Sequence, residues 1–288
     1  MLAGLCALMS VVTGNFVFGQ NGSPQKPEIN LSGIVLTSDH HWSVKPGDPP
    51  CRSSNWALVS GRTTYVLCGD KTTLEQFSRQ RVSISGLLDE ESFVEYGTQM
   101  IRRKIAVRSI ESSELPRDAI ESLVNQLKVM PWPGPGCGPR CWAFEFTDPM
   151  IQILQAGRGA QGVLLDHLND QAIQDQIVML LGGVGDESVI WPIIETLTDG
   201  NEASLDARSK RLNLIGNVAL TNLTVSEIIW HHGGGITIQR CPDTVRSCWS
   251  KWWLERKDKF KVGVGGDRDY TNYPNYGIYE QFADYSPR

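Results

Sequence analysis

The spacing of apolar residues changes its period once along this chain, and that change limits the possible folds more than any single motif. In the first part, apolar and polar residues alternate over short runs such as residues 82–87, which is typical of half-buried strands. From Pro116 onward the spacing is helical, because apolar residues recur at i, i+3, i+4 and i+7 starting from Ile120. A β-rich part followed by an α-helical part predicts an α+β fold with two domains.

Residues 32–112 are predicted to form a small β-barrel. Two β-rich runs, residues 56–59 and 64–67, flank a short Ser-Gly-Arg turn, so we expect a hairpin there. Five or so short strands in about 80 residues suit a small barrel or a sandwich. The segment resembles a small OB-like barrel domain of exported bacterial proteins in three runs, residues 65–69, 81–86 and 105–110. That resemblance implies a ligand groove on the barrel.

An internal repeat marks the α-helical part. Two apolar helical segments, centred near Leu164 and Ile193, lie about 30 residues apart, a period typical of helical solenoids. The Leu-Leu-Gly-Gly-Val-Gly-Asp run at residues 180–186 and the proline-led residues 192–197 resemble the HEAT-like repeat family. The resemblance implies a short α-solenoid over residues 148–258, which binds other proteins through an extended surface.

The same resemblance assigns roles to residues around the turn of the repeat. Gly182, Gly183 and Gly185 are expected to let the chain reverse after a helix that ends at Leu181. Asp186 is expected to cap orphan N–H groups of the next helix. Gln174 departs from the pattern, because the family often has Arg at that position.

Residues 113–147 are predicted to be a helix followed by a connector rich in proline and glycine. Prolines at positions 131, 133, 135 and 139 alternate with glycines, and such a run cannot continue a helix. We therefore place the domain boundary in this connector. Residues 20–31 are predicted to be a linker. Residues 259–288, rich in Gly, Tyr, Asn and Asp, are predicted to be a disordered tail.

Residues 1–19 have the character of a secretory signal peptide. The first 18 residues contain no charged side chain and are mostly apolar, and Val17 and Gly19 place small residues before a possible cleavage site at Gln20. No Lys or Arg precedes the apolar run, so an uncleaved membrane anchor is the alternative. The sequence thus predicts an exported protein, periplasmic or extracellular, without membrane contact beyond this segment.

The cysteines agree with export. The chain has seven, and six remain beyond the signal segment, in the neighbouring pairs Cys51–Cys68, Cys137–Cys141 and Cys241–Cys248. Even, locally grouped cysteines in an exported chain predict disulfides, although six cysteines allow several connectivities. Zinc is the alternative, but no His lies at a matching spacing.

Residues 231–235, His-His-Gly-Gly-Gly, are the main candidate for chemistry. Such a run can supply oxyanion-hole N–H groups in esterases, but the chain lacks the G-x-S-x-G nucleophile elbow that must accompany it. Adjacent side chains on a strand point to opposite faces, so His231 and His232 are weak metal-ligand candidates. We therefore predict no catalytic, cofactor-binding or metal-binding residue with the pattern of a known site.

Three tryptophans form a second candidate. Trp249, Trp252 and Trp253 are spaced i, i+3 and i+4, so they share one face of a helix. Core packing is the simpler interpretation, and a possible interaction surface for a partner or a sugar is the other.

The charge of the chain bears on its partners. A net charge of -5 lacks the clustered Lys and Arg of a nucleic-acid binder, so we expect no nucleic acid as partner. With no cofactor motif, the sequence favours an exported, non-enzymatic protein-interaction or scaffold module of the cell envelope, whose partner is another envelope protein. The alternative is an envelope hydrolase, or a glycan- or metal-binding protein that uses the Trp-rich end and the loop at His231 and His232.

Overall fold

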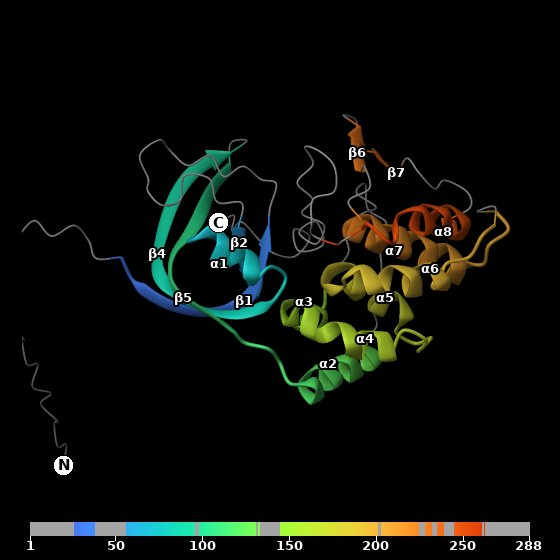
Figure 1. The fold of residues 1–288 in the computed structure, drawn as a ribbon, viewed down its shortest axis with the longest axis horizontal. Coiled ribbons are helices and arrows are strands. Elements are labelled where there is room, and N and C mark those ends of the chain that lie inside the picture. The colour runs from blue at the N-terminus through green and yellow to red at the C-terminus, as the bar shows by residue number, and fades with distance from the viewer. Residues whose placement is uncertain are drawn as a thin grey trace, which may run out of the picture.

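The computed structural model describes residues 26–37, 56–95, 98–130, 132, 145–200, 203–224, 228–231, 235–238, 245–260 and 262. In Figure 1 a β-barrel lies at one end of the molecule and a group of helices at the other. This composition is compatible with the α+β class that the apolar spacing predicts. The signal segment, the loop at His232 and the cysteines at 51, 137, 141 and 241 lie outside the described residues.

A closed barrel is formed by β1 (Glu28–Thr37), β2 (Trp56–Ser60), β3 (Thr63–Cys68), β4 (Arg81–Glu95) and β5 (Thr98–Ser112), in the order β1-β2-β3-β5-β4. β1 pairs with both β2 and β4 and so closes the barrel, while the pairing of β3 with β5 is parallel. The short helix α1 (Lys71–Gln76) connects β3 to β4. The hairpin expected around residues 60–62 is confirmed, with Ser60 paired to Thr63 and Gly61 at a φ of 57°.

The strand β1 begins earlier than the sequence suggested. Residues 28–31 were predicted to be part of a linker, but Glu28 and Leu31 pair with Leu87 and Ile84 of β4. The alternation of polar and apolar residues in Glu28–Leu31 suits a strand, and backbone pairing with β4 fixes it.

The helical part begins with α2 (Arg117–Val129), which buries the apolar stripe expected from Ile120 to Leu127. It continues with α3 (Asp148–Ala156), η1 (Arg158–Ala160), α4 (Gln161–Asp166), α5 (Gln174–Val184), η2 (Glu187–Val189), α6 (Ile190–Thr196), α7 (Ala207–Thr224), the strands β6 (Ile228–His231) and β7 (Gly235–Ile238), and α8 (Val245–Arg256).

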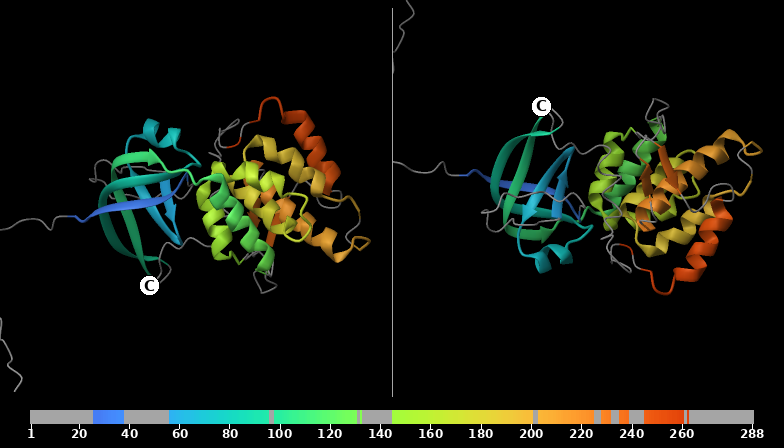
Figure 2. Two further views of the ribbon diagram at one scale, coloured as in Figure 1. Left: turned by 90° about the horizontal axis from the view of Figure 1, so that it is seen from below. Right: turned by 90° about the horizontal axis from the view of Figure 1, so that it is seen from above.

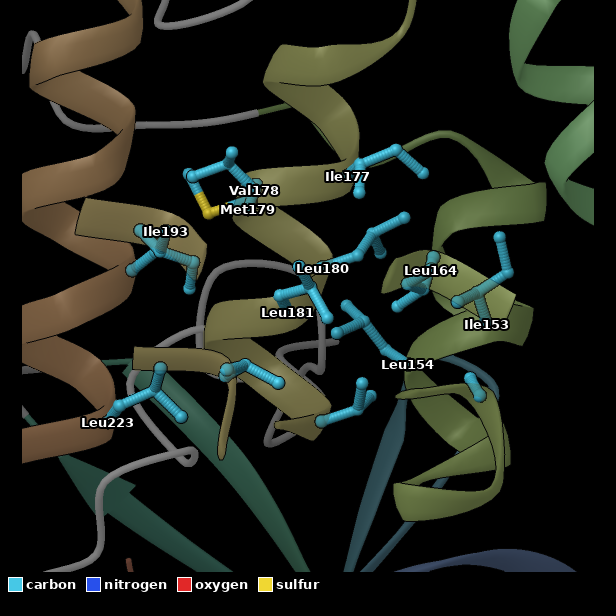
Figure 3. Close-up of a cluster of buried hydrophobic side chains, with 14 of the residues drawn as sticks. Ile153, Leu154, Leu164, Ile177, Val178, Met179, Leu180, Leu181, Ile193 and Leu223 are labelled. Carbon is cyan, nitrogen blue, oxygen red and sulfur yellow. The ribbon is translucent and has the colours of Figure 1, made fainter. Parts of the chain in front are cut away.

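Helix α5 is the centre of the helical part. Its apolar residues Ile177–Leu181 have no exposed surface, and they pack among α3, α4 and α7 (Figure 3). A helix that is apolar on all sides is stable only when neighbours cover it all round. Of the glycines predicted to form the turn, Gly182 and Gly183 instead lie inside α5, whose last residue is Val184, while Gly185 caps its C-terminus. Asp186 caps the next turn as expected, because its side chain accepts a hydrogen bond from the Ser188 backbone N–H.

The barrel has a hydrophobic core of its own, and its outer face adds residues to the core of the helices. Along β1 and β2 the side chains alternate, so Val35 and Leu58 fill the barrel while Ile34 and Val59 point out of it. These outward residues belong to the same apolar cluster as α3 and α5. The two ribbons lie side by side in both views of Figure 2.

Polar contacts join the same two parts of the molecule. The side-chain amide of Gln155 on α3 donates to the Gly61 carbonyl at 2.6 Å, and Arg62 pairs with Asp148 at 3.3 Å. The Arg158 N–H donates to the Arg79 carbonyl at 3.2 Å. The β2–β3 turn is therefore held against α3 by hydrogen bonds as well as by apolar packing.

Two further observations concern the cysteines and the lengths of the helices. Cys68 and Cys248 are each disulfide-bonded, whereas the three predicted pairings involve cysteines outside the described residues and stay predictions. Within the described ranges, no helix combines the length and the hydropathy needed to cross a membrane.

Candidate functional site

The histidine candidate is only partly described. His231 ends β6 and pairs with Gly235 of β7, while His232 lies outside the described residues. In the part of the chain that is described, no group of three or more His, Cys, Asp or Glu residues could hold a metal ion.

The three tryptophans lie in the hydrophobic core of the described residues, which leaves little of their surface for a partner. Trp249, Trp252 and Trp253 are 1%, 8% and 8% exposed. The indole N–H of Trp249 donates to Asn217 at 2.6 Å, and Phe260 packs edge-on against Trp252 and Trp253. The shared face of this helix therefore points inward, where large rings gain most from burial.

The contact of Phe260 also corrects the predicted extent of the tail. Residues 259–288 were expected to be disordered, but Phe260 packs against the tryptophans and Val262 is only 3% exposed. The contacts of Phe260 with rings seven and eight residues earlier continue the packing of α8 beyond residue 258.

A pocket of about 250 Å³ opens where the end of α2 meets the beginnings of α5 and α7. Its apolar wall is formed by Leu127, Met130 and Trp132. Its polar lining consists of Lys128, Gln171, Asp175, Gln176, Arg208 and Arg211.

The wall at Trp132 is built by several contacts. The indole N–H of Trp132 donates to the Glu145 carbonyl at 2.7 Å, and the ring is 7% exposed. The guanidinium of Arg211 lies over this ring, 5.4 Å from its centre, and donates to the Trp132 carbonyl at 3.2 Å. The carboxylate of Asp175 forms an ion pair with Arg211, with 2.5 Å between Oδ2 and Nε. Together these contacts fix one side of the pocket.

The opposite side is formed by charged residues with different partners. Lys128 pairs with Asp170 at 3.0 Å. The hydrogen bond from Lys128, together with one from the Ala172 N–H, lowers the pKa of Asp170 below its usual value. Arg208 instead donates from Nη1 to Gln171 at 2.9 Å and from Nη2 to Gln174 at 3.0 Å.

Gln176 lies at the buried side of the pocket. It is 4% exposed, and no hydrogen bond joins its side-chain amide to another described residue. Buried polar groups usually have a partner, from the protein, water or a ligand. The amide of Gln176 is therefore available to a molecule that enters the pocket.

The electrostatics of the pocket favour an anion. The described lining carries three cationic side chains and one carboxylate. The N-terminal turns of α5 and α7 both contribute residues to it, and helix N-termini carry partial positive charge. No Ser, Thr, Cys or His belongs to the lining given by the described residues, so binding is the chemistry this arrangement supports best.

Sequence reasoning missed this pocket. Its residues come from three segments that only the fold brings together, and none of them forms a motif. One signal was present: Gln174 departs from the arginine of the HEAT-like pattern, and the structure places it against the Arg208 guanidinium. An arginine there would bring two cations into contact.

Comparisons with known proteins add no assignment. No protein-family model, curated protein or solved structure gives a significant match to this chain. The OB-like and HEAT-like resemblances thus remain predictions, and the function is argued from the pocket.

Proposed function

We propose that this protein is an exported interaction module of the cell envelope, in which an OB-like barrel domain supports a short HEAT-like solenoid domain. The helical part binds an acidic segment of a partner protein in the pocket between α2, α5 and α7. The observation that carries the proposal is the lining of this pocket, with three cationic side chains, one carboxylate and an aromatic wall.

The size of the pocket favours a side chain over a cofactor. Sites for drug-sized molecules and cofactors measure about 300–1,000 Å³. The 250 Å³ available here is the liquid volume of roughly eight water molecules. One or two side chains of a partner fit such a space.

The surface beside the pocket favours a protein ligand. Val129 is 80% exposed and Met130 is 42% exposed, directly after Lys128. Exposed apolar side chains next to a charged pocket are typical of binding surfaces, where apolar contacts supply affinity and charges supply specificity.

Selection from a displayed random heptapeptide library, on immobilised full-length protein, tests this proposal. We expect the selected peptides to be enriched in Asp and Glu, and to bind in solution with an affinity that falls as salt rises. The Lys128→Glu variant should weaken binding of the selected peptide roughly tenfold. Lys251→Glu, with the same charge change on an exposed residue of α8, is the matched control and should bind as wild type.

Two outcomes would refute the proposal. The first is that selection yields no peptide that binds saturably. The second is that the selected peptides are neutral or basic and bind Lys128→Glu as well as they bind wild type.

A further inference from the structure

We infer that Arg208 is the residue that binds the ligand, that it recognises a carboxylate group, and that Gln171 and Gln174 position its guanidinium. This inference rests on the proposed function and names the chemical group that the pocket selects. The carboxylate belongs either to an Asp or Glu side chain of the partner or to its C-terminus.

Arg208 differs from the other two cations in its partners. Lys128 has a carboxylate at 3.0 Å and Arg211 has one at 2.5 Å. Among the described residues no carboxylate lies within ion-pair distance of Arg208, and its two side-chain hydrogen bonds go to neutral amides. An anion entering the pocket therefore meets one cation that no described carboxylate contacts directly, although Asp206 lies near enough to interact with its charge.

The two glutamines orient the guanidinium and leave donors free. A guanidinium has five N–H donors, of which Gln171 and Gln174 accept two, from different nitrogens. The remaining donors can bind both oxygens of one carboxylate, a pairing that the planar fork of arginine favours. Because the fork is already held in place, less conformational entropy is lost when the ligand binds.

Gln176 offers a second contact to the same ligand. Its amide is nearly buried, lines the pocket and makes no hydrogen bond within the described part of the chain. The N–H₂ of this amide can donate to a carboxylate oxygen. A buried donor next to an exposed guanidinium gives the pocket both a charged and a neutral contact.

Asp175 favours a carboxylate over a phosphate. Its side chain also lines the pocket, where it pairs with Arg211. A phosphate monoester carries close to two negative charges at neutral pH, and a carboxylate carries one. The repulsion from Asp175 is therefore smaller for a carboxylate.

A double-mutant cycle between protein and peptide tests the inference. The probe is the best peptide selected on wild type, made in three forms: unmodified, with its C-terminus amidated, and with each Asp or Glu replaced by Asn or Gln. The protein variants are Arg208→Gln and Arg208→Lys. Arg108→Gln is the matched control, because Arg108 lies on the barrel in an exposed pair with Glu28.

We expect Arg208→Gln to weaken binding of the unmodified peptide roughly tenfold or more, because a hydrogen-bonded charge pair is lost. Arg208→Lys should weaken it less, and Arg108→Gln should bind within about twofold of wild type. The peptide form that lacks the recognised carboxylate should bind wild type as weakly as the unmodified peptide binds Arg208→Gln. Which form shows this loss identifies the source of the carboxylate.

The cycle is decisive because the loss of affinity caused by Arg208→Gln and the loss caused by removing the carboxylate should not add. If removing the carboxylate weakens binding to wild type and to Arg208→Gln by the same factor, Arg208 is not its partner and the inference is overturned. If both modified peptides bind wild type as tightly as the unmodified one, no carboxylate is recognised, and the inference also fails. Should Arg208→Gln not fold, as judged by circular dichroism, Arg208→Lys and the peptide forms still decide. Failure of the proposed function is a separate result, because wild type then selects no acidic peptide at all.

Discussion

The contact between α5 and α7 depends on one glycine, and replacing it tests how the helical core is packed. A Cβ atom added at Gly182 would lie 2.6 Å from Cα and 2.7 Å from Cβ of Ala219 on α7. Neither atom can move away without a shift of the α7 backbone. The amide of Asn222 also donates to the Gly182 carbonyl at 2.7 Å, which holds the two helices at this distance.

The Gly182→Ala substitution is therefore expected to destabilise the protein. Overpacking usually costs about 1–3 kcal/mol, and against a neighbour as rigid as a helix backbone we expect about 2–3 kcal/mol. Alanine stabilises a helix by about 1 kcal/mol relative to glycine, which offsets part of that cost. The net loss is about 1–2 kcal/mol, which lowers the urea midpoint by about 0.5–1 M for a slope near 2 kcal/mol/M.

Urea unfolding followed by circular dichroism measures this change. Gly162→Ala in α4 is the matched control, because a Cβ there meets nothing within 4 Å. This variant should be more stable than wild type by up to about 1 kcal/mol. If Gly182→Ala raises the midpoint as Gly162→Ala does, the close approach of α5 and α7 is not real and the argument fails.

Two predictions concern carboxylates that hold helix starts. Burial raises the pKa of Asp186, but hydrogen bonds from the side chain and N–H of Ser188 and from Gln161 outweigh it, so the pKa lies below its ordinary value of 3.8. A carboxylate with a depressed pKa stabilises the fold at pH values where it is ionised, so Asp186→Ala should lower the free energy of unfolding by about 1 kcal/mol at pH 7. In urea titrations at lower pH, this loss should shrink as the pH falls below about 4 and Asp186 of the wild type becomes protonated. An equal loss at every pH would contradict this. Asp199 accepts hydrogen bonds from the N–H and hydroxyl of Ser247 at the start of α8. Asp199→Ala should therefore speed amide hydrogen exchange in α8 but not in the barrel. Unchanged exchange in α8 would show that this cap is dispensable.

Local features of the fold could be predicted from the sequence because they depend on neighbours a few residues apart. The apolar stripe from Ile120 to Leu127 predicted α2, and the turn residues at 60–62 predicted a hairpin. The spacing of Trp249, Trp252 and Trp253 placed them on one helix face, which the structure buries. In each case the period of the pattern matches the period of the element.

Composition alone was a poorer guide. The polar stretch before residue 32 suggested a linker, yet Glu28 to Leu31 pair with β4. The glycines at 182 and 183 suggested a turn, yet they lie within α5. Glycine serves both for chain reversal and for close helix approach, and only the neighbour across the interface, here Ala219, decides between the two.

The sequence by itself therefore determined the order of β-rich and α-helical parts and the inward face of several elements, because those depend on local periodicity. Tertiary structure decided the parallel pairing of β3 with β5, the packing of the outer face of β1 and β2 against the helices, and the pocket. The pocket brings Lys128, Gln176 and Arg208 together from three different helices. Contacts between residues so far apart in the chain leave no periodic trace, since each residue also satisfies the local pattern of its own helix.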